Sequence, residues 1–139
     1  MSHNISISTI VAKIKRLDIK GGATNFFDKL DFNIREVIEN NIELHNDEKF
    51  ILCYYLNTDY WWVITNLRLL ISENEQIESY LFDSIKTVEA KDIFERGISN
   101  QECDRLQLIL QNEQEKNLNL ENNTWFSVLN LLKFLLNKG

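Results

Sequence analysis

Short apolar runs alternate with short polar segments from residue 50 to residue 120, and this alternation constrains the fold more than any other feature of the sequence. The runs are too short for typical helices and are rich in aromatic and branched side chains, as strands are. The polar segments have the composition of turns. The pattern predicts about seven strands, which cover residues 50–56, 60–64, 67–71, 77–82, 85–90, 106–111 and 116–120.

The chain ends in a segment with a strong helical pattern. Asn123 or Thr124 can cap this helix by accepting hydrogen bonds from free backbone N–H groups. Apolar side chains follow at helical spacing and form one stripe, which consists of Trp125, Leu129, Leu132 and Leu136. A short sheet with an open end needs an apolar cover, so we expect this helix to close the β-domain.

The N-terminal third of the sequence predicts helices that pack on the β-domain. A weak apolar stripe precedes Gly21-Gly22 and consists of Ile10, Ile14 and Leu17. A second helix is expected to begin at Thr24 or Asn25 and to end at Asn40-Asn41. Its apolar face comprises Phe26, Phe27, Leu30, Ile34, Val37 and Ile38. The polar stretch 91–102 is expected to hold one short helical turn.

Three short motifs resemble pleckstrin-homology-like domains, in particular their bacterial branch. Residues 47–52 look like the "GEK"-like start of that branch, and residues 62–71 look like the hairpin that follows. Residues 82–88 are similar to its next strand. The resemblance covers residues 44–139 and implies an α+β fold. In this fold a seven-stranded antiparallel barrel or sandwich is capped by the C-terminal helix and preceded by an N-terminal helical arm at residues 1–43.

The same resemblance implies roles for the motif residues and a binding role for the protein. Thr65-Asn66 should turn a hairpin, and Arg68 should pair with an acidic neighbour across the sheet. Two departures are visible. Asp47 stands where the family usually has glycine, and the loop 57–59 lacks the Lys and Arg residues of lipid-binding members, with only Lys49 nearby. The resemblance therefore argues against phosphoinositide recognition.

The net charge of the chain is −6 and is unevenly distributed. Residues 1–20 carry four basic side chains and one acidic side chain, whereas residues 21–139 carry eleven basic and twenty acidic side chains, a net charge of −9. Solubility alone would explain such a charge. As a recognition feature, it should repel nucleic acid and anionic lipid headgroups and attract a basic protein.

Two classes of function fit this charge pattern. The first is a protein-interaction module, whose sharper form is an acidic immunity-type inhibitor of a basic toxin. The alternative is a peripheral membrane or lipid-binding domain that uses the basic N-terminal arm. The thin apolar stripe of that arm argues against a membrane as the main partner.

Catalytic motifs are missing from the sequence. It has no glycine-rich phosphate loop, no GxSxG motif and no HExxH motif. A zinc site needs three or four converging donors, and the only histidines are His3 and His45. Nothing in the sequence brings Cys103 and Asp104 to His45 as a nucleophilic group. We therefore predict a non-enzymatic protein without a cofactor or metal.

An aromatic cluster is the most unusual local feature of the sequence. Adjacent strand residues point to opposite faces of a sheet, so Trp61 and Trp62 cannot share one core. Two interpretations remain open. The outer indole either stabilises the sheet, in a cross-strand pair or under the N-terminal helix, or it is an exposed anchor for a partner. The predicted partner-binding residues are Tyr55, Asp59, Tyr60, Trp61, Trp62, Glu73, Glu75 and Glu78.

The sequence predicts a cytoplasmic protein. No apolar run approaches the roughly 20 residues of a membrane span, and residues 1–10 lack the pattern of a secretory signal. Reduced thiols are expected, and Cys53 should be buried because it lies in an apolar run. An exposed edge strand or an outer tryptophan leaves a symmetric dimer open as a further possibility.

Overall fold

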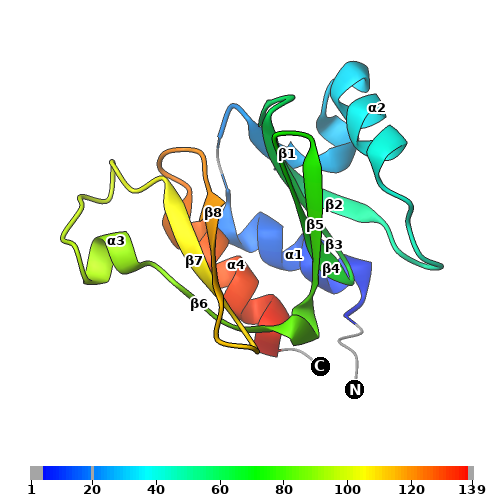
Figure 1. Cartoon of the computed structure of the whole chain (residues 1–139). Coiled ribbons are helices and arrows are strands. Elements are labelled where there is room, and N and C mark those ends of the chain that lie inside the picture. Colours follow the sequence, from blue (N-terminus) through cyan, green and yellow to red (C-terminus); the bar gives the residue numbers. More distant parts are fainter. Residues whose placement is uncertain (1–4, 20, 138–139) are drawn as a thin grey trace.

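The computed structural model describes residues 5–19 and 21–137 and has an α+β fold with two antiparallel sheets (Figure 1). The first sheet has the strand order β1-β2-β3-β4-β5, with β1 at Thr24–Phe26, β2 at Phe50–Asn57, β3 at Tyr60–Thr65, β4 at Arg68–Glu73 and β5 at Gln76–Leu81. The second sheet has the order β6-β7-β8, with β6 at Ile85–Glu89, β7 at Arg105–Leu110 and β8 at Glu115–Asn119.

Four α-helices and two short 3-10 helices complete the described chain. The α-helices are α1 at Ile7–Leu17, α2 at Phe32–Asn41, α3 at Lys91–Phe94 and α4 at Trp125–Asn137. The 3-10 helices are η1 at Phe27–Lys29 and η2 at Phe82–Ser84. The seven predicted strands, the C-terminal helix and the short turn of helix after β6 are therefore confirmed.

The main core lies between the two sheets and is closed by α1 and α4 (Figure 1). Trp62 projects from β3 into this core and is fully buried. Ile10 and Ile14 enter from α1, as their spacing predicts, and Leu132 is among the residues that α4 contributes. The predicted role of the C-terminal helix as an apolar cover is confirmed.

A second, smaller core lies on the outer face of the five-stranded sheet, where α2 covers β2, β3 and β4. Ile38 of α2 is fully buried there, together with Cys53, Trp61 and Val63 of the sheet. The prediction that this helix packs on the β-domain is confirmed. Residues before position 44 thus contribute to both cores, α1 to the main core and α2 to the outer one.

The second predicted helix is wrong in the part that precedes Phe32. Thr24–Phe26 forms β1, which pairs with β2, and the helix begins only at Phe32. The Glu121 side chain explains the difference, because it accepts hydrogen bonds from the backbone N–H groups of Gly22 and Ala23 at 2.6 and 3.0 Å. It also accepts a hydrogen bond from the Thr24 hydroxyl at 2.8 Å. These bonds hold the segment extended against the sheet.

Side chains rather than strand pairing join the two sheets. Within residues 5–19 and 21–137, no strand of one sheet pairs with a strand of the other, so the predicted barrel is not closed. The Trp62 indole N–H donates to the carbonyl oxygen of Asn119 at 2.8 Å, and the N–H of Asn119 donates to the Tyr60 hydroxyl at 2.8 Å. Lys116 of β8 adds ion pairs to Glu73 and Glu78 of the first sheet.

Candidate functional site

Two neighbouring turns at one end of the five-stranded sheet bring the predicted acidic residues together. Asp59 lies in the turn between β2 and β3, and Glu75 lies in the turn between β4 and β5. The N–H of Asn74 donates to the Asp59 carbonyl oxygen at 2.8 Å, which fixes one turn against the other. Glu73 directly precedes the second turn, and Glu78 is the third residue of β5 after it, so all four exposed acidic residues lie in or near these two turns.

Burial decides between the two interpretations of the aromatic cluster. Trp61 is 2% exposed and lies in the outer core, and Trp62 is 0% exposed and lies in the main core. Tyr60 is also buried, and Tyr55 is half-buried beside Trp61 on the outer face. The interpretation that the N-terminal helix covers the outer indole is confirmed, and the interpretation of an exposed tryptophan anchor is wrong.

Tyr60 has a structural role at the junction of the sheets. Burial raises the pKa of Tyr60 to about 12, so the hydroxyl stays protonated at neutral pH while its oxygen accepts the hydrogen bond from Asn119. The Trp62 indole N–H donates to the carbonyl oxygen of Asn119. Tyr60 and Trp62, both predicted site residues, therefore support the acidic end from inside the molecule.

The four acidic side chains differ in their pairing. Lys116 lies 3.2 Å from a Glu73 carboxylate oxygen and 2.7 Å from one of Glu78. The hydrogen bond from Lys116 lowers the pKa of Glu78. Asp59 and Glu75 have no ion-pair partner in the part of the chain that the structure describes. Lys116 offsets only one of the two charges on Glu73 and Glu78, whereas the carboxylates of Asp59 and Glu75 are not offset by any ion pair among the described residues.

Glu75 occupies an unfavourable backbone position for its residue type. Asn74 and Glu75 form a two-residue turn between paired Glu73 and Gln76, and both have positive φ, 52° and 68°. Glycine adopts such angles freely and asparagine tolerates them, whereas other L residues lose roughly 1–2 kcal/mol each. The turn thus holds a carboxylate at its tip although glycine would fit with less strain.

A groove of about 230 Å³ lies between α2 and the β4–β5 hairpin. Its helix side consists of Val37 and Asn41, and its floor includes Trp61 and Ser72. Glu75, Thr58 and Ile77 complete its lining. Strand register explains the hollow, because Trp61 pairs with Ser72 and Ser72 with Ile77, which places a small side chain between two large ones.

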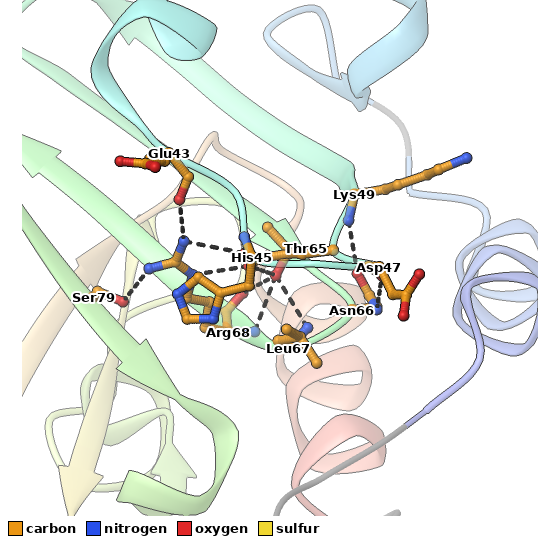
Figure 2. Close-up of polar contacts among 10 residues, drawn as sticks. Glu43, His45, Asp47, Lys49, Thr65, Asn66, Leu67, Arg68 and Ser79 are labelled. Atoms are coloured by element: carbon orange, nitrogen blue, oxygen red, sulfur yellow. Dashed lines mark hydrogen bonds and ion pairs between the residues drawn. The ribbon is translucent and has the colours of Figure 1, made fainter.

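The residues that carry the family resemblance converge on a buried network at the opposite end of β3 and β4 (Figure 2). Glu48 accepts hydrogen bonds from Arg68 Nε at 2.8 Å, from Arg68 Nη2 at 3.1 Å and from the Thr65 hydroxyl at 2.6 Å. The predicted pairing of Arg68 with an acidic neighbour is confirmed. Arg68 also donates to Ser79 and to the Glu43 carbonyl oxygen.

The same network fixes the hairpin turn between β3 and β4. The side-chain oxygen of Asn66 accepts from the N–H of Lys49 at 2.8 Å, and its amide nitrogen donates to the Asp47 carbonyl oxygen at 3.0 Å (Figure 2). The predicted hairpin is confirmed, although its turn is shifted by one residue, since Thr65 ends β3 and Asn66 and Leu67 form the turn. Since these polar groups bond one another, the motif has a structural role and ties the entry of β2 to the hairpin.

Burial raises the pKa of Glu48, but hydrogen bonds from Arg68, from the N–H of His45 and from Thr65 outweigh this effect. The net result is a pKa below its ordinary value of 4.5. The carboxylate is therefore ionised at neutral pH, as its pairing with Arg68 requires. The network has the properties of a permanent ion pair rather than of a proton-transfer group.

Other candidate chemistry is dispersed. Cys53 and Cys103 are free thiols, both buried, and burial raises the pKa of each. Within residues 5–19 and 21–137, no three His, Cys, Asp or Glu side chains are grouped so that they could hold a metal ion. None of the described helices combines the length and the apolar character needed to cross a bilayer. His3 lies outside the described residues.

Sequence reasoning missed one apolar surface near α3 and the start of α4. Phe94 is 74% exposed and Phe126 is 63% exposed, and both rings contact Trp125 edge-on. Phe94 lies in the stretch whose polar composition predicted only a helical turn, and Phe126 directly follows the first residue of the predicted stripe. A phenylalanine on the polar side of an amphipathic helix is the signal that would have indicated this surface.

Comparisons with protein-family models, with curated proteins and with solved structures find no match for this chain.

Proposed function

We propose that this chain is a non-enzymatic protein-interaction module on a PH-like scaffold, and that it binds a basic protein through the acidic end. Strands β2 to β8 followed by α4 have the number and order that the resemblance implies. The strand β1 and the helices α1 and α2 are additions around this arrangement. The acidic end then supplies the binding surface of an intracellular module.

The observation that carries this proposal is the pair of free carboxylates, Asp59 and Glu75, at the tips of two mutually fixed turns. The hydrogen bond between the turns fixes the backbone that carries these charges, so a partner has to order only the two side chains on binding. A basic patch on the partner would be steered towards this end by the net negative charge of the chain. In its most specific form, the proposed function is that of an immunity-type protein, which inhibits a basic toxin.

The test is affinity capture of the tagged full chain from a lysate of its source cell, followed by mass spectrometry. The double variant Asp59→Lys, Glu75→Lys is compared with the wild type. Glu102→Lys reverses one charge at a distant position and is the control for charge reversal as such, because Glu102 is exposed in the segment that joins α3 to β7, away from α2 (Figure 1). Circular dichroism of each protein confirms that it is folded.

The expected result is one basic protein captured by the wild type and by Glu102→Lys, and lost in the double variant. Capture should also weaken between about 0.1 M and about 1 M salt, because the screening length falls from ~10 to ~3 Å. A partner that binds the double variant equally well would contradict the proposal. Recovery of lipid without a protein partner would also contradict it and would favour the basic N-terminal arm as the binding element.

A further inference from the structure

The groove between α2 and the β4–β5 hairpin offers both apolar surface and hydrogen-bond acceptors. Val37, Ile77 and the small accessible part of Trp61 provide the apolar surface. The groove has a volume of about 230 Å³ and is open to solvent. This space suits one long side chain of a partner, whereas a helix or a strand is too large for it.

The acceptors around the groove outnumber the donors. The Asn41 side-chain N–H donates to the Val37 carbonyl oxygen at 2.6 Å, which leaves the Asn41 amide oxygen as an acceptor. The hydroxyls of Thr58 and Ser72 have no hydrogen-bond partner among the described residues and can both accept. Glu75 adds a carboxylate at the rim.

Two further features make the groove electrostatically negative. Asn41 is the last residue of α2, and the final carbonyl groups of a helix carry a partial negative charge. Asp59 follows Thr58 directly and carries a free carboxylate in the adjoining turn. None of the described residues that line the groove is basic. The occupant is therefore expected to be a cation with an apolar stem.

We propose that the groove receives a single arginine side chain of the basic partner. This inference rests on the proposed function and deepens it by specifying the recognised group. A guanidinium has five N–H donors in a planar fork, which matches a carboxylate and several separate acceptors better than the three donors of an ammonium group. The methylene stem would pack against Val37 and Ile77.

A role of Glu75 in binding arginine would explain why a strained backbone position holds a glutamate. Its positive φ of 68° places the carboxylate at the hairpin tip, on the rim of the groove. An arginine whose stem lies along the floor would reach this carboxylate with its charged end. Charge-assisted pairs between arginine and a carboxylate are among the stronger hydrogen bonds in proteins.

The test uses fluorescein-labelled tetra-arginine, tetra-lysine and tetra-citrulline peptides and the full chain, with binding followed by fluorescence anisotropy. Citrulline keeps the shape of arginine without its charge. We expect tetra-arginine to bind at least about threefold more tightly than tetra-lysine and tetra-citrulline not to bind. NMR should show that tetra-arginine shifts the indole N–H resonance of Trp61.

Variants of each wall locate the site. Glu75→Gln should weaken tetra-arginine binding about tenfold, since a charged hydrogen bond contributes about 1.5 kcal/mol. Ser72→Val and Val37→Phe each reduce the space from a different side and should weaken binding at least about threefold. Glu102→Gln removes the same charge elsewhere and should leave the affinity within about twofold of the wild type.

Equal affinity for the arginine and lysine peptides, or undiminished binding in both Ser72→Val and Val37→Phe, would overturn the groove proposal. Absence of tetra-arginine binding at millimolar concentration would also overturn it. Such a failure is distinguishable from failure of the proposed function. Capture of a basic protein that depends on Asp59 and Glu75 would still support binding through the acidic end, whereas loss of that dependence would contradict the function itself.

Discussion

Glu48 and Arg68 form a two-point ion pair in which the carboxylate side chain is fully buried, with N–O distances of 2.8 and 3.1 Å. Glu48 precedes β2, and Arg68 begins β4. The pair therefore joins the entry of the five-stranded sheet to its central hairpin. Because Thr65 and the N–H of His45 also donate to this carboxylate, every member of the network depends on the others.

Removal of one partner from this pair should be strongly destabilising. We expect Arg68→Ala to lower the free energy of unfolding by about 3–5 kcal/mol, because it leaves a buried carboxylate without its cation. Urea denaturation monitored by tryptophan fluorescence measures the change. Lys86→Ala is the control, since Lys86 pairs with Glu113 at the surface, and its effect should stay within about 0.5 kcal/mol. Equal effects of the two variants would contradict a buried, structural role for Arg68.

The Glu48 pair should also make stability depend on pH in the acid range. The pKa of Glu48 is lower in the folded protein than its ordinary value of 4.5, so folding favours the ionised form. Its contribution is complete above about pH 5 and is lost as the pH falls through the folded pKa. Urea denaturation between about pH 7 and pH 3 should show a steeper loss for the wild type than for Glu48→Gln.

Asp92 contributes to the same acid range, because a hydrogen bond from Arg105 lowers its pKa below the ordinary value of 3.8. The Glu48→Gln variant should therefore keep a residual pH dependence. NMR titration of the carboxyl carbon separates the two groups, and the Glu48 resonance should titrate below pH 4.5. A Glu48 midpoint at or above this value would show that burial, rather than Arg68, dominates its protonation.

The substitution Glu75→Gly should raise the stability of the protein and weaken its binding to the partner. Glu75→Gly relieves a positive φ of 68°, and we expect the free energy of unfolding to rise by about 0.5–1 kcal/mol. Affinity for the basic partner should fall because the free carboxylate is lost. The measurements are urea denaturation and tetra-arginine binding on the same preparation.

Asn74→Gly is the matched control for Glu75→Gly. It changes the neighbouring turn residue, whose φ is 52°, but asparagine tolerates this conformation and carries no charge. A smaller gain in stability and unchanged affinity are expected. Unchanged affinity in Glu75→Gly would mean that the hairpin tip does not contact the ligand.

Loss of the Glu121 side chain should release β1 from the edge of the sheet. Glu121→Ala removes three hydrogen bonds at once, those that the carboxylate accepts from the N–H groups of Gly22 and Ala23 and from the Thr24 hydroxyl. Amide hydrogen exchange should accelerate in Thr24–Phe26 more than in β3, because only the edge strand depends on this carboxylate. Uniform acceleration over both strands would indicate global destabilisation and would contradict a local role.

Local sequence pattern was sufficient for most elements of the fold. Alternation and turn composition located β2 to β8, and three- and four-residue spacing located α1 and α4. The segment around Phe26 was misjudged because its apolar spacing continues smoothly into α2. What makes this segment extended is a carboxylate, Glu121, that lies about a hundred residues further along the chain. No local pattern contains that contact.

The candidate site was predictable in its charges but not in its shape. The acidic turns were evident from Asp59, Glu73, Glu75 and Glu78, whereas Lys116, the cation that pairs with two of them, comes from the other sheet. The sequence predicted that Trp61 and Trp62 point to opposite faces of the sheet but left open which of them is the outer one, and the burial of Trp61 depends on the packing of α2. The groove depends on the register that sets Ser72 beside Trp61, and register is a property of the paired strands.

The residues at the junction between the sheets should differ in how well they tolerate substitution. Both bonds that cross it at Asn119 use the main chain of that residue, the carbonyl oxygen towards Trp62 and the N–H towards Tyr60. Any residue other than proline supplies those two groups, so position 119 should accept many residue types during evolution. Positions 60 and 62 have no such freedom, because there the contacting atoms belong to the side chains themselves.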